Sequence, residues 1–125
     1  MQPEIIFLKE TYKKENGLWV LDFDDIKVPF KIIKRSLVYF PPFAVGGNHS
    51  HPRKEAFLGI GEGLELIYMD KGVNKKEKMY EKGVLKLFVI PPHLPHAVVN
   101  NSKNFAFLIE FADGEQKEVK MEKLL

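Results

Sequence analysis

The nine residues Gly47–Glu55 read GNHSHPRKE and hold two of the four histidines in the chain. The other two lie together in the later stretch PPHLPH. Side chains two residues apart on extended backbone point to one face, so His49 and His51 would present their imidazoles side by side. Glu55 follows across a short turn that contains proline and can fold back toward them. His96 can reach the same point from a neighbouring strand of a closed sheet.

Three imidazoles and one carboxylate form a ligand set that suits Fe, Mn, Co, Ni, Cu or Zn and suits calcium or magnesium poorly. We therefore predict that His49, His51, Glu55 and His96 hold a divalent transition metal. The alternative is that these histidines are surface or packing residues. The chain has no cysteine, which excludes thiolate zinc sites, iron–sulfur clusters, disulfides and a thiol nucleophile.

Around these clusters, apolar residues recur at period two and turn residues interrupt the chain about every eight to twelve positions. The pattern predicts an all-β fold, with only the charged tail 115–125 open to a helix. The mixed-charge run 74–82 is expected to be a solvated hairpin. The expected strands are Leu18–Phe23, Val28–Phe40, Ala56–Ile60, Leu64–Met69, Val84–Ile90, Ala97–Val99 and Phe105–Phe111. In the second of these the alternation changes phase near Ile32-Ile33, which indicates either a bulge or a break into two strands.

The chain has 125 residues, of which 45% are apolar and 29% charged, and we expect one domain over residues 1–125. Nineteen basic and seventeen acidic side chains are interspersed, which argues against a nucleic-acid partner. The start of the chain has no signal-peptide pattern, and no apolar run approaches the roughly 20 residues that span a bilayer. The expectation is a cytoplasmic protein with no membrane partner.

Two stretches resemble the conserved motifs of the cupin superfamily, the RmlC-like jelly rolls. Residues 47–63 match the first motif in the two histidines, the glutamate and a closing GEG. Residues 83–100 match the second motif in Gly83, Pro91, His96 and Asn100, whereas His93 stands where that motif usually has glycine. The resemblance implies a double-stranded β-helix, the cupin jelly-roll barrel, which encloses a cavity.

Cupins commonly pair through an outer sheet, so the resemblance also implies a homodimer. The strand Phe105–Phe111 has a second face that is half apolar, and this face would serve as the contact. The segment Ile5–Leu8 of the same chain is the alternative cover for it.

The stretch Val28–Arg35, VPFKIIKR, followed by Leu37–Phe40, looks like the opening of small sugar-nucleotide 3,4-ketoisomerases and WxcM-like cupins. In that group the histidine pair is implicated as acid and base beside a sugar ketone, often without a metal. The resemblance implies a sugar-nucleotide isomerase or epimerase, with a nucleotide sugar as substrate and His49 and His51 as its catalytic pair. The group usually has Arg-Gly before the first histidine, where this chain has Gly46-Gly47.

The missing arginine calls for another anion anchor, and Arg53, Lys54 or Arg35 could replace it. Arg35 and Tyr39 share a face of their strand, and an inward arginine would need an anionic partner. We therefore predict that Arg35, Tyr39 and His93 are candidates for the substrate pocket.

Two other functions stay open at this point. The complete ligand set also suits a metal-dependent dioxygenase-type oxidoreductase, in which the metal passes electrons to oxygen inside a dry barrel. A non-catalytic cupin that binds a metal or a carbohydrate is the third alternative.

Overall fold

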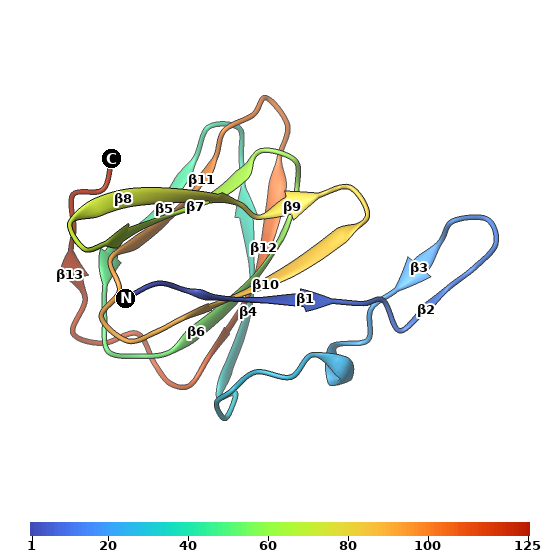
Figure 1. Cartoon of the computed structure of the whole chain (residues 1–125), viewed down its shortest axis with the longest axis horizontal. Coiled ribbons are helices and arrows are strands. Elements are labelled where there is room, and N and C mark those ends of the chain that lie inside the picture. The colour runs from blue at the N-terminus through green and yellow to red at the C-terminus, as the bar shows by residue number, and fades with distance from the viewer.

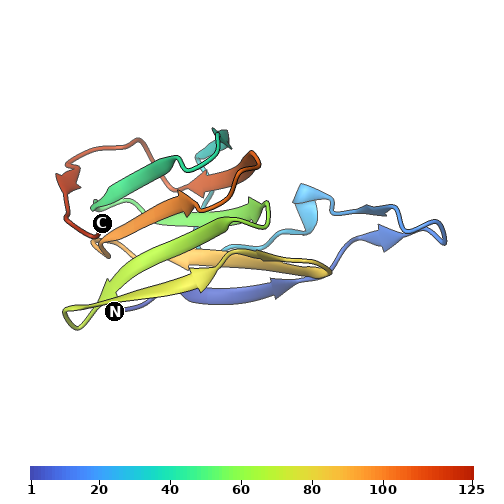
Figure 2. The ribbon, with the colours of Figure 1, turned by 90° about the horizontal axis from the view of Figure 1, so that it is seen from above.

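The computed structural model describes residues 1–125 as two antiparallel β-sheets packed face to face, with an N-terminal hairpin that projects from one end (Figures 1 and 2). The first sheet has the strand order β1-β10-β6-β12-β4, with β9 paired to β10. Its strands are β1 (Glu4–Leu8), β4 (Lys34–Phe40), β6 (Glu55–Ile60), β9 (Tyr80–Glu81), β10 (Val84–Ile90) and β12 (Ala106–Ala112).

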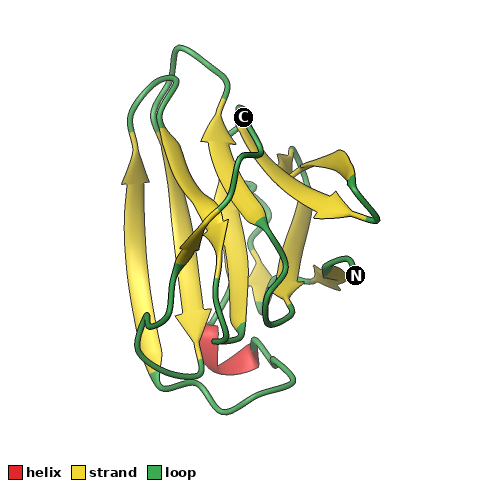
Figure 3. Ribbon diagram, turned by 90° about the vertical axis from the view of Figure 1, so that its left-hand side faces the viewer, coloured by secondary structure: helices red, strands yellow, loops and turns green.

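The second sheet has the order β13-β5-β11-β7-β8 and carries His49 and His96, and His51 follows directly after its strand β5. Its strands are β5 (Val45–Ser50), β7 (Leu64–Asp70), β8 (Val73–Lys78), β11 (His96–Asn100) and β13 (Lys120–Met121). The projecting hairpin pairs β2 (Tyr12–Lys13) with β3 (Trp19–Val20). The one helical element is the 3-10 turn η1 (Phe23–Asp25), and no helix has the length and hydropathy needed to cross a membrane (Figure 3). The predicted all-β class is confirmed.

The core lies between the two sheets because alternation sends every second side chain inward. Leu64, Leu66 and Tyr68 of β7 meet Phe57 of β6 and Phe88 of β10 there, all of them buried. A second apolar layer lies on the outer face of the first sheet, where the segment 21–32 covers it. Sequence alternation alone does not reveal this cover, since the segment has no regular strand of its own.

The predicted strand Val28–Phe40 is therefore too long. Residues 28–33 belong to the covering segment, with Val28, Phe30 and Ile32 packed on the outer layer, and only Lys34–Phe40 form a strand. The half-apolar face of the strand Phe105–Phe111, expected to be a dimer contact or to be covered by Ile5–Leu8, points inward instead, because its Ala106 and Leu108 lie in the core. No cover for it is needed from the segment Ile5–Leu8. This segment lies within β1, which pairs edge to edge with β10.

Two charged stretches also differ from expectation. The run 74–82 forms most of β8, the solvated edge strand of the second sheet, and β9. Exposed lysines on an edge strand hinder pairing with other chains. The tail 115–125 forms no helix but a short strand, β13, and a buried Leu124 that packs on Ile67 and Ala97.

Candidate functional site

A β-bulge in β5 brings His49 opposite His96 of β11. β5 pairs with β11 in a register that joins Ala97 to Gly47 and His96 to His49, so Asn48 is the extra residue. Gly47 and Asn48 both have left-handed backbone, with φ of +80° and +64°. A Cβ on Gly47 would lie 3.2 Å from the backbone oxygen of His96, so glycine also permits the close approach of the two strands.

The side chains of His49, His51, Glu55 and His96 meet inside the barrel. One ligand atom from each lies within 4.8 Å of the others, and the three imidazole centroids are 4.9 to 5.1 Å apart. His51, Glu55 and His96 are each 2% exposed, whereas His49 is only partly buried. The four side chains thus lie together, as their spacing indicates, and their role as ligands stays a prediction.

Backbone carbonyls fix the orientation of two of the rings. The His51 Nδ1 lies 3.2 Å from the Arg53 carbonyl oxygen, and the His96 Nδ1 lies 2.8 Å from that of Leu94. A carbonyl only accepts, so we assign the proton of each neutral ring to Nδ1, which leaves a lone pair on each Nε2. Metal-binding histidines are held in the same way.

Both Nε2 lone pairs then face one carboxylate oxygen. The Oε1 of Glu55 lies 2.9 Å from His51 Nε2 and 3.3 Å from His96 Nε2. Despite these distances, none of the three buried atoms has a hydrogen-bond partner with suitable geometry. Three converging acceptors repel one another unless a proton or a cation lies between them. The two imidazole nitrogens, the carboxylate oxygen and their burial therefore fit a divalent transition metal, and the cluster can hold one.

Arg53 holds the other oxygen of Glu55. Its Nε and Nη2 donate to Glu55 Oε2 at 2.9 and 2.6 Å, and Nη2 also donates to Glu110 Oε1 at 2.9 Å. The Arg53 Nη1 donates to the Gly114 carbonyl at 3.2 Å. The guanidinium is therefore an internal clamp and not a free anion anchor, because its donors already point at protein oxygens.

A pocket of about 150 Å³ opens beside the cluster, between the two sheets. A cavity of roughly this volume accommodates one six-membered ring. Apolar side chains form one part of its wall, with Phe57 from β6, Val38 and Phe40 from β4, Val98 from β11 and Leu108 from β12. The polar lining residues are His49, Arg53, Glu55, His96, Glu110 and Gln116.

Glu110 is the pocket residue that sequence reasoning missed. It follows Ala106 and Leu108 on the inward face of β12, and a lone charge in such an apolar row is a signal that could have found it. Gln116 lies in the exposed loop after β12, and no pattern in the sequence indicates its place at the pocket.

The electrostatics of the pocket follow from burial and close charges. Burial lowers the pKa of His49 from 6.5 to about 4, and the His96 and His51 rings add to the shift. Burial alone would raise the pKa of Glu55, but a proton or a cation between its Oε1 and the Nε2 atoms of His51 and His96 outweighs burial and holds that pKa well below its usual range. Burial raises the pKa of Glu110, and the charge of Glu55 raises it further. His49 is thus neutral and Glu55 ionised near pH 7.

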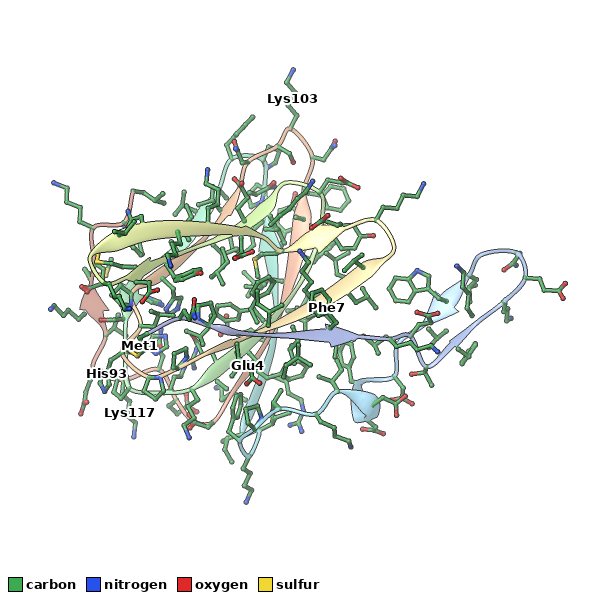
Figure 4. The ribbon with its side chains drawn as sticks, viewed as in Figure 1. Met1, Glu4, Phe7, His93, Lys103 and Lys117 are labelled. Carbon is green, nitrogen blue, oxygen red and sulfur yellow. The ribbon has the colours of Figure 1, made fainter.

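The three residues predicted for the substrate pocket lie elsewhere in this chain. Arg35 and Tyr39 do share a face of β4, but both are exposed on its outer side, while Val38 and Phe40 point inward. His93 is exposed at the end of the barrel opposite the N-terminal hairpin (Figure 4). It has φ of +67°, which explains the usual glycine there, and its backbone N–H donates to the His51 carbonyl at 2.8 Å.

Known structures with the same fold include small ketoisomerases. A TDP-fucose-3,4-ketoisomerase from Campylobacter jejuni has a TM-score of 0.73 and 22% identity, covering 98% of this chain and 90% of that one. A mutant of the 3,4-ketoisomerase from Thermoanaerobacterium thermosaccharolyticum, in complex with TDP-4-keto-6-deoxyglucose, has a TM-score of 0.71 and 16% identity, covering 94% and 83%. The predicted cupin jelly-roll fold is confirmed.

A larger protein contains the same fold as a part. The capsular polysaccharide assembling protein CapF from Staphylococcus aureus has a TM-score of 0.66 and 15% identity, and the match covers 96% of this chain but only 34% of CapF. A search of curated proteins found no match. The family described as "FdtA: WxcM-like, C-terminal" matches residues 1–120. The chain belongs to this WxcM-like family.

Proposed function

We propose that the chain is a sugar-nucleotide isomerase that moves a keto group between neighbouring ring carbons of a nucleoside-diphosphate sugar. The observation that carries the proposal is a ring-sized pocket, beside a neutral imidazole, in a chain of the WxcM-like family. The ketoisomerase names of the structural neighbours support it. A pocket of about 150 Å³ takes the sugar ring, so the nucleotide would lie outside it.

In this proposal His49 carries the carbon-bound proton. Its lone pair takes the proton from the carbon next to the ketone, the ketone oxygen gains a proton, and an enediol forms. The neighbouring hydroxyl then loses its proton as His49 returns the first one to the former carbonyl carbon. Glu110 lines the same pocket, and its raised pKa suits it to exchange the oxygen-bound protons. No atom is gained or lost overall.

We propose that His51, Glu55 and His96 hold a divalent transition metal beside this pocket. Two carboxylates, Glu55 and Glu110, share the single guanidinium of Arg53, which leaves an ionised pocket with an excess negative charge. That negative charge disfavours the anion that forms as the enediol loses a proton. A bound divalent cation would supply compensating positive charge. His51 does not line the pocket, so its role here is to hold the cation and not to move the substrate's proton.

The activity test uses TDP-4-keto-6-deoxyglucose and follows the appearance of its 3-keto isomer by NMR. Replacing His49 by Asn should lower kcat by about 100-fold or more, the usual contribution of a general base. His93→Asn is the matched control because this exposed histidine lies outside the pocket. No turnover by the unmodified chain, across a panel of nucleotide sugars that also leave the melting temperature unchanged, would reject the isomerase.

The metal test is elemental analysis of protein purified without a nickel column. We expect close to one equivalent in the unmodified chain, loss of the metal in His51→Ala, and retention in His93→Ala. Less than about a tenth of an equivalent of any transition metal would contradict the proposed ligand set.

A metal-dependent dioxygenase is the second candidate, favoured by the convergence of all four side chains in one cluster. Its ligand set includes His49, whereas the isomerase keeps His49 free as a base. In the isomerase, His49→Asn keeps the metal and loses activity. Loss of the metal in that variant, together with oxygen uptake on an enediol or diketone, would favour the dioxygenase.

We also propose that the chain acts as a homodimer. An aromatic cluster on the outer face of the first sheet supports this, because the rings of Tyr39, Phe105 and Phe107 pack in tilted and edge-to-face pairs with centroids 5.7 to 6.0 Å apart. Tyr39 and Phe105 are 55% and 59% exposed, and Leu37 beside them is 68% exposed. A contiguous apolar patch of this kind is typical of a protein contact.

A further inference from the structure

The bulged residue Asn48 is held by the C-terminal tail. Because Asn48 is the extra residue of β5, it has no partner in β11. The backbone N–H of Glu122 donates to the Asn48 carbonyl at 2.9 Å, and the backbone N–H of Leu124 donates to Asn48 Oδ1 at 3.0 Å. The tail thus satisfies both acceptors that the bulge leaves unpaired.

The tail has its own anchors across the second sheet. β13 pairs with β5 and sets Met121 opposite His49, at the end of the barrel away from the hairpin (Figure 1). Leu124 is buried against Ile67 and Ala97, and its carbonyl accepts a hydrogen bond of 2.8 Å from Asn74 of β8. The tail therefore supplies the edge strand β13 beside β5 and also contacts β8 at the opposite edge of the sheet.

These contacts touch the chain neighbours of two site histidines. Asn48 precedes His49, and Ala97 follows His96, yet the tail contacts neither imidazole by a hydrogen bond. A left-handed φ of +64° is unfavourable for a residue other than glycine, although asparagine tolerates it better than most, so surrounding contacts must maintain it. The family match ends at residue 120, before Glu122 and Leu124.

We propose that residues 120–124 form a latch that sets the position of His49 by holding the Asn48 bulge. Asn48 and Leu124 are its positioning residues. The latch rests on the proposed isomerase function only in the test that measures activity.

The first test observes the four imidazole Cε1–H signals by NMR in chelator-treated protein. Leu124→Ala removes the apolar anchor, and we expect it to shift or broaden the His49 signal and leave the exposed His93 signal unchanged. Leu125→Ala is the matched control, because this leucine is 57% exposed. An unchanged His49 signal in Leu124→Ala would overturn the latch. If Leu124→Ala unfolds the chain, the milder Leu124→Val decides by the same criterion.

The second test measures turnover with the nucleotide sugar. Leu124→Ala should lower kcat about tenfold with KM within about twofold, because a displaced base slows the chemical step more than it weakens binding. Asn48→Asp keeps an oxygen acceptor for the Leu124 N–H and should retain activity. Equal kcat values in Leu124→Ala and Leu125→Ala would count against the latch. If the unmodified chain has no activity, the proposed function fails while the NMR result still decides the latch.

Discussion

At the scale of single residues, Arg53 is the side chain on which the charged part of the site depends. Its guanidinium is the shared partner of Glu55 and Glu110, and its side chain is 12% exposed. Replacing it by Met leaves the buried Glu55 and the partly buried Glu110 without their shared cation. We expect Arg53→Met to lower the free energy of unfolding by about 3 kcal/mol, as when one partner of a buried ion pair is removed.

Urea unfolding measures this loss. Lys54→Met is the matched control, because Lys54 is the exposed neighbour of Arg53 and its side chain makes no hydrogen bond or ion pair. A loss below about 1 kcal/mol in Arg53→Met, the range of a surface pair, would contradict the account of Arg53 as a clamp.

The pH dependence of stability is the second prediction at this scale. His49 binds a proton near pH 4 in the folded chain but near pH 6.5 when unfolded, so its contribution to stability is lost as pH falls from 6.5 to about 4. The lowered pKa of Glu55 adds a further loss below 4.5, and the raised pKa of Glu110 partly opposes it. Urea midpoints measured with a chelator should fall through this range. His49→Gln should flatten the plot of urea midpoint against pH between about pH 4 and 6.5. An unchanged slope there would refute the lowered pKa of His49.

At the scale of elements, the bulge of β5 decides where the histidines point. Gly47 and Gly72 have nearly equal φ values, +80° and +77°, but only Gly47 has atoms within reach of an added Cβ. We expect Gly72→Ala to cost about 1 to 2 kcal/mol from backbone strain alone. Gly47→Ala should cost more and also weaken metal binding, because its Cβ would approach His96 and His49. Equal effects of the two substitutions, by urea unfolding and elemental analysis, would contradict this.

Strand prediction succeeds at this scale where one face is clearly apolar. Val84–Ile90 is confirmed with its bounds, and Leu64–Met69 differs from β7 by one residue. β5 was not predicted, since its two glycines and the bulge interrupt the alternation. The sequence predicts a strand over residues 28–33, which instead belong to the segment that covers the outer layer, because apolar residues that pack onto a sheet have the same composition as residues within one.

At the scale of the whole molecule, the exposed aromatic cluster predicts association. Sedimentation velocity should give a particle of twice the 14.4 kDa chain mass, and Tyr39→Glu with Phe105→Glu should halve it. Phe7 on β1 is 69% exposed and serves as the control, since it lies on another strand (Figure 4). Dissociation by Phe7→Glu alone would mean that a different face pairs.

The residue order alone is enough to predict the strand-rich class and the meeting of the two histidine clusters, because residue spacing and period two are local properties of the backbone. Which face of β12 points inward depends on long-range packing, since both faces carry apolar residues and a segment distant in sequence covers one of them. The same long-range packing leaves Arg35 and Tyr39 on the outer side of β4 and places the Arg53 guanidinium between Glu55 and Glu110. Those outcomes depend on which side chains meet across the two sheets, and no local pattern encodes such contacts.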